Sequence, residues 1–137
     1  FVQGALAVVV PVFATTLTIP ALVEHIGTHI ELAPLLLSAT QECALLLAIY
    51  SLTFFLSTVA RAPLGIAFAV LCFTIFQFAV YLVERLTHWS VFRLADVERF
   101  LDIERTHSLD WRRFAPLVAL TLIFYVAALI SFERRTP

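Results

Sequence analysis

Residues 43–83 read CALLLAIYSLTFFLSTVARAPLGIAFAVLCFTIFQFAVYLV, and Arg61 is the one charged residue among them. A helix needs about 20 mostly apolar residues to cross a hydrocarbon core of about 30 Å. The uncharged runs 43–60 and 62–83 each come close to that length. Pro63 suits the first turn of a new helix. This stretch therefore predicts two membrane-spanning helices that are joined by a tight turn and run antiparallel, side by side.

Two further uncharged runs, 1–23 and 114–132, flank this pair. The sequence thus predicts four spans, at about 5–23, 38–60, 63–83 and 114–132. The second can begin as early as Leu32 if Glu42 is tolerated. No ten-residue stretch alternates with period two, which favours helices over a barrel. We expect residues 1–137 to form a single transmembrane domain. The first run lacks a signal peptide's basic region and cleavage pattern, and the chain lacks an initiating Met, so we expect it to be part of a longer chain.

Composition supports the same class of protein. The 137 residues are 61% hydrophobic and 14% charged, with a mean hydropathy of +0.96. Soluble domains are about 25% charged. Nine arginines and no lysine face ten acidic residues, so no basic excess suggests a nucleic-acid partner. The expected partner of this surface is the lipid bilayer, which makes the chain an all-α integral membrane protein.

The polar loop 84–113 is the longest connection and contains six arginines and six acidic residues. Apolar side chains recur in it at helical spacing, at Val91, Leu94, Val97 and Leu101. This pattern predicts an amphipathic helix that lies on the membrane surface. Interfacial anchors are expected at its two ends and after the last span, at Trp89, Trp111, Arg134 and Arg135.

The sequence contains no phosphate-binding glycine loop, no H-E-x-x-H and no C-x-x-C. We therefore expect neither enzymatic activity nor a cofactor. His25 and His29 have a spacing that suits a metal on a helix. Gly27 lies between them in a short interfacial connection, however, so polar residues at headgroup level are the better interpretation, and no metal site is predicted.

Glu42 is the acidic residue expected at or inside a membrane boundary. Ionisable residues there are costly and mark a functional site by default. One interpretation is a hydrated carboxylate at headgroup level. The other is an inward-facing carboxylate that lines a translocation path or pairs with an arginine of the loop. The candidate pathway or gating residues are Glu42, Gln41, Ser57 and Arg61.

Three segments together resemble a known family. They are ALLLAIYSLTFFLSTVARAPLGIAFAVLCF (44–73), the closing YVAALISFERRTP (125–137) and a first span that begins FVQGAL. Together they resemble the carboxy-terminal part of type 2 ATP-binding-cassette (ABC) exporter permeases. Those permeases have six spans, and the four here would correspond to the third through sixth.

The resemblance implies a function and partners. The chain would be the membrane-spanning permease component, and a partner ABC-type ATPase would hydrolyse ATP. A second permease subunit, in a homo- or heterodimer, would complete a path along the dimer interface. The turn at Arg61 and the tail at Arg134 would be cytoplasmic. The loop 84–113 would face outside and form external or re-entrant helices. The location would be the cell membrane, the inner one if the protein is bacterial.

The residues alone leave an alternative open. A non-transporting membrane scaffold or assembly subunit would dock a soluble partner through the charged segment 84–113. Arginine counts do not decide the orientation, because the loop carries six arginines and also six acidic residues. Topology distinguishes the two functions, since a scaffold that follows the arginine count has the loop in the cytoplasm.

Overall fold

The computed structural model describes residues 1–24, 31–60, 62–95, 103 and 105–134. Four long helices dominate it: α1 (Val2–Glu24), α2 (Leu32–Val59), α3 (Pro63–Leu82) and α5 (Trp111–Glu133). All four are long and apolar enough to cross a membrane. No strand occurs in the described ranges. The predicted all-helical class, with four helices able to span a membrane, is therefore confirmed.

Three helices begin before the predicted spans: α1 at Val2, α2 at Leu32, which is the early start that tolerating Glu42 allows, and α5 at Trp111. In α2, the hydroxyls of Ser38 and Thr40 donate to carbonyl oxygens within the same helix, those of Pro34 and Leu36, at 2.9 and 2.8 Å. In α5, Asp110 is the N-cap and its carboxylate accepts from the backbone N–H of Arg112. A capped first turn can include charged residues, because its side chains reach the headgroup region.

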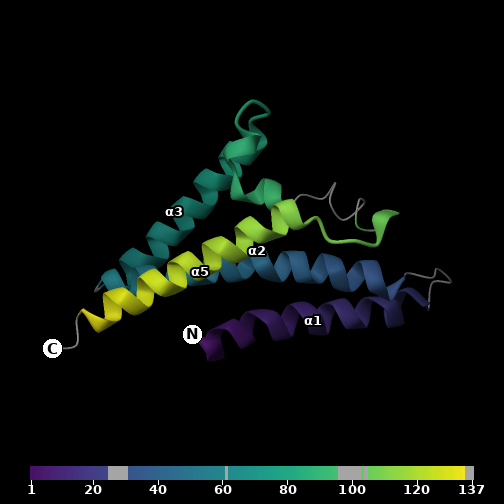
Figure 1. The fold of residues 1–137 in the computed structure, drawn as a ribbon, viewed down its shortest axis with the longest axis horizontal. Coiled ribbons are helices and arrows are strands. Elements are labelled where there is room, and N and C mark those ends of the chain that lie inside the picture. Colours follow the sequence, from purple (N-terminus) through teal and green to yellow (C-terminus); the bar gives the residue numbers. More distant parts are fainter. Residues whose placement is uncertain (25–30, 61, 96–102, 104, 135–137) are drawn as a thin grey trace.

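The helix α2 is the centre of the assembly (Figure 1). Its most extensive contact is with α5, and α1 lies along another side of it. The helix α3 leaves α2 at the tight turn and diverges from α2 and α5 toward its C-terminal end. Two short 3₁₀ helices, η1 (Thr87–Trp89) and η2 (Val91–Ala95), occupy the resulting wedge between α3 and the start of α5.

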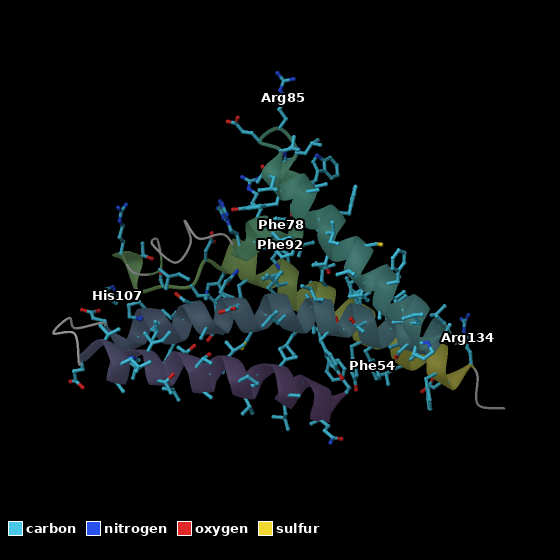
Figure 2. The ribbon with its side chains drawn as sticks, turned by 180° about the vertical axis from the view of Figure 1, so that it is seen from behind. Phe54, Phe78, Arg85, Phe92, His107 and Arg134 are labelled. Atoms are coloured by element: carbon cyan, nitrogen blue, oxygen red, sulfur yellow. The ribbon has the colours of Figure 1, made fainter. Side chains whose placement is uncertain are left out.

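The core lies where η2 meets the long helices. Ala44, Leu45 and Leu117 are buried there. Five half-buried apolar residues pack against them: Ile49, Val91, Phe92, Leu94 and Phe114. Phe92 also meets Phe78 of α3 edge to face, with the ring centroids 6.0 Å apart (Figure 2). The connection between α3 and α5 therefore contributes part of the packed interior.

This packing bears on the predicted amphipathic helix. Val91 and Leu94 of its apolar face are described, and they point into the bundle core from a 3₁₀ turn. Val97 and Leu101 lie outside the described residues. A surface helix over this stretch is thus not shown, and the part that is seen folds back against the spans.

Candidate functional site

Two glutamine side chains hold the η1–η2 segment in place. Gln41 of α2 is 3% exposed, and its Nε2 donates to the carbonyl oxygen of Leu94 at 2.5 Å. Gln77 of α3 accepts through Oε1 from the backbone N–H of Val91 at 3.1 Å. The Ser90 hydroxyl donates to the backbone carbonyl of Gln77 at 2.8 Å. Buried polar groups need such partners, so two different spans fix the path of this loop.

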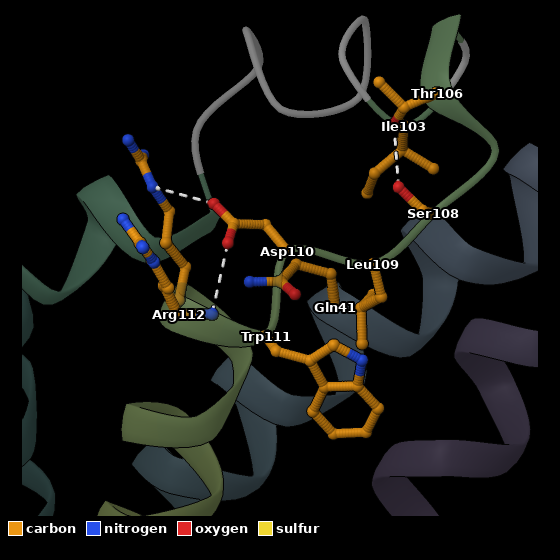
Figure 3. A pocket seen from close by; sticks show the side chains of 9 residues that line it. Gln41, Ile103, Thr106, Ser108, Leu109, Asp110, Trp111 and Arg112 are labelled. Atoms are coloured by element: carbon orange, nitrogen blue, oxygen red, sulfur yellow. Dashed lines mark hydrogen bonds and ion pairs between the residues drawn. The ribbon is translucent and has the colours of Figure 1, made fainter.

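A cavity of about 560 Å³ lies beside this amide network, at the start of α5 (Figure 3). Its described lining combines residues of α2, of the segment before α5 and of the first turn of α5: Gln41, Ile103, Thr106, Ser108, Leu109, Asp110, Trp111, Arg112 and Arg113. Small-molecule sites typically occupy about 300–1,000 Å³ and combine apolar walls with a few polar groups. This cavity has that size and that kind of lining.

Charged groups at the cavity have defined roles. Asp110 caps α5, and its carboxylate lies 3.5 Å from the Nε of Arg113. The Nη1 of Arg113 also donates to the carbonyl oxygen of Arg93, at 3.3 Å, which ties η2 to α5. The Arg112 side chain has no hydrogen-bond or ion-pair partner in the part of the chain that the structure describes.

A second side-chain contact, between His107 and Glu31, lies at the same end of the bundle. The Nε2 of His107 is 2.5 Å from a carboxylate oxygen of Glu31, immediately before α2. His107 has a positive φ of 50°, an uncommon backbone conformation outside glycine. Both side chains are more than half exposed, so solvent screens the pair and it contributes little stability. The contact between His107 and Glu31 joins the connection before α5 to the start of α2.

The lengths of α2 and α5 are consistent with a cavity near the membrane interface. From Gln41 to Val59, α2 rises by about 27 Å, and α5 is about 33 Å long, at 1.5 Å per residue. A hydrocarbon core of about 30 Å fits between the level of Gln41 and Trp111 and the opposite ends of the two helices. Trp111 and Trp89 are 70% and 73% exposed, as interfacial anchors require.

The sequence-predicted site residues occupy different places. Gln41 is buried at the cavity, whereas its neighbour Glu42 is exposed on α2. Ser57 is exposed near the other end of α2, and its hydroxyl donates to the carbonyl of Phe54 within the helix. Arg134 is exposed at the end of α5. Arg61 and Arg135 lie outside the described residues. The structure therefore does not bring these residues together into one site.

Sequence reasoning missed Gln77, Asp110 and Arg112 as parts of this region. The available signal was an amide near the end of an apolar span and a helix-capping aspartate directly before an aromatic residue. No group of three or more metal-ligating side chains occurs among the described residues. His25 and His29 lie outside them.

No family model, no curated protein and no solved structure matches the chain.

Proposed function

We propose that residues 1–137 are the carboxy-terminal four-span part of an ABC-type exporter permease, working in the cell membrane beside a partner ATPase. One observation carries this proposal. The connection before the last span folds back into the bundle as η1 and η2, where the buried Gln41 of α2 and the half-buried Gln77 of α3 bond to its backbone. A re-entrant element at this position is what the resemblance to type 2 exporter permeases implies.

Such an element has a mechanical role in a permease. Because η2 fills the wedge between α3 and α5, it closes one end of the membrane region while leaving α3 free to diverge. The path for substrate would form between two permease subunits, with the exposed Glu42 face of α2 as one of its walls.

Topology provides the test. In a cysteine-free background, Arg85→Cys and Arg134→Cys place a thiol on each side of the membrane. Arg85 projects at the free tip of the α3 end (Figure 2), and Arg134 lies at the end of α5. A membrane-impermeant maleimide should label the Arg85→Cys variant in intact cells and the Arg134→Cys variant only after lysis.

The reverse labelling pattern would contradict the exporter assignment. It would put the segment 84–113 in the cytoplasm, where a scaffold would dock a soluble partner. A variant with cysteine at Ala60, the C-cap of α2, is the control. It must share the sidedness of Arg134, because α2 ends on the same side as α5.

A further inference from the structure

The cavity at the start of α5 contains a buried acceptor without a partner. The Nε2 of Gln41 is used by the carbonyl of Leu94, and the Oε1 of Gln41 has no hydrogen-bond partner among the described residues. The side chain is 3% exposed and lies between Asp110, Leu109 and Trp111 (Figure 3). A buried acceptor left unpaired is destabilising, so the site favours a molecule that brings a donor.

The cavity also offers a positive charge. Asp110 and Arg113 neutralise each other, which leaves the described lining with the positive charge of Arg112. The end of α5 itself is not the anion site, because the N–H groups of Arg112, Arg113 and Phe114 all bond to Asp110. The Arg112 guanidinium at the cavity edge is therefore the group that would pair with an anion.

The position and the lining of the cavity indicate whether its ligand is a lipid or a free anion. The cavity lies at the start of the apolar helix α5, and its walls include Ile103, Leu109 and the exposed Trp111. A molecule that has an anionic phosphoester and an adjacent donor, and that approaches from an apolar phase, is a glycerophospholipid. Free inorganic phosphate is also an anion, but it has no apolar part that would hold it beside the apolar walls of the cavity.

We propose that this cavity binds the headgroup of a glycerophospholipid. Its phosphate pairs with Arg112, and its terminal donor, an ammonium or a hydroxyl, bonds to the Oε1 of Gln41. The geometry requires a headgroup donor, so ethanolamine and glycerol headgroups bind and choline, whose nitrogen carries only methyl groups, binds poorly. This inference requires a membrane-spanning chain but does not depend on the exporter function.

Lipid retention measured by native mass spectrometry tests the proposal. The protein is released from nanodiscs that contain phosphatidylethanolamine, phosphatidylglycerol and phosphatidylcholine in equal amounts. We expect retention of the first two to exceed that of phosphatidylcholine by about tenfold, the effect of one strong hydrogen bond. Equal retention of all three lipids would overturn the proposal.

Variants with matched controls test the two proposed contacts, those of Gln41 and Arg112. Gln41→Met should abolish the preference over phosphatidylcholine, whereas Gln77→Met removes the other loop-holding amide outside the cavity and should keep it. Arg112→Gln should reduce retention of all three lipids, whereas Arg85→Gln removes a distant charge from the same membrane face and should not. If Gln77→Met loses the preference as well, loop placement and not a Gln41 contact is responsible, and the proposal fails.

Competition with inorganic phosphate and with glycerophosphoethanolamine distinguishes a lipid site from a site for a free phosphate or headgroup. Under the proposal, neither displaces the retained lipid at millimolar concentration, because the acyl chains contribute to binding. Displacement by inorganic phosphate alone would identify a phosphate site and contradict the lipid assignment. Because Arg112 is exposed, Arg112→Gln should fold even if Gln41→Met does not, so the proposal stays testable with this variant alone.

Discussion

At the scale of residues, burial in this chain is determined by helix neighbours and not by polarity. Leu117 and Leu122 lie on the same helix, but Leu117 is 0% exposed and Leu122 is 55% exposed. Lipid tails are as apolar as leucine, so transfer from lipid into the protein interior contributes little. What Leu117 gains is close packing with Ala44, Leu45 and the residues of η2.

Truncating Leu117 tests this packing. Leu117→Ala should lower the free energy of unfolding in mixed micelles by about 2 kcal/mol, at about 24 cal/mol per Å³ of unfilled space. Leu122→Ala should have little effect, because lipid or detergent fills the space. Equal losses in both variants would show that α5 does not present Leu117 to η2.

Glu42 carries the functional prediction at this scale. In a complex that transports, Glu42→Gln should leave expression and unfolding unchanged and alter transport, because the carboxylate is exposed. Leu32→Ala, at another exposed position of the same helix, is the control. A Glu42→Gln variant with full transport activity would remove Glu42 from the pathway.

The sequence could not distinguish Gln41 from Glu42 as the buried residue. The helix α2 has apolar residues on every side, so no polar face orients it, and only contacts with α1, α5 and η2 decide which side is covered. Similarly, the cavity joins Gln41 to Asp110 and Arg112, which are far away in sequence. Local patterns contain no information on that juxtaposition.

At the scale of elements, the spans could be predicted because length and lack of charge are sufficient in a membrane. The spacing of the loop residues alone could not predict the path of η1 and η2, and only the family resemblance implied external or re-entrant helices there. Val91 and Leu94 have the same spacing whether they face lipid headgroups or a protein core, and the choice depends on Gln41 and Gln77 pairing with the loop backbone. The start of α5 shifted because Asp110 caps a first turn that contains Arg112 and Arg113.

The contact between α1 and α2 provides an element-scale prediction. A Cβ on Gly4 would collide with the ring of Tyr50, whereas a Cβ on Gly65 would meet only the Cβ of Ala62, at 3.8 Å. Alanine is intrinsically the better helix former, by about 1 kcal/mol. Gly65→Ala should therefore preserve or raise thermal stability in detergent, and Gly4→Ala should lower it. The same sign in both variants would contradict the close approach of α1 and α2.

At the scale of the whole molecule, much of the apolar surface has no partner within the chain. No described residue of α3 is buried, and large apolar side chains such as Leu64, Phe68 and Leu71 are exposed along it. Lipid satisfies such a surface, and so does a second subunit. The sequence predicts that the four spans exist, but it cannot predict how α3 diverges, because an apolar helix packs equally well against lipid and against protein.

The central claim is that this chain is the permease part of an exporter driven by a separate ATPase. The most direct measurement is affinity purification of the full-length protein from its native membranes in mild detergent, followed by quantitative mass spectrometry. The account predicts a stoichiometric partner with an ATPase phosphate-binding loop and ATP hydrolysis by the purified complex. A clean preparation with no such ATPase, unaffected by added ATP, would contradict it.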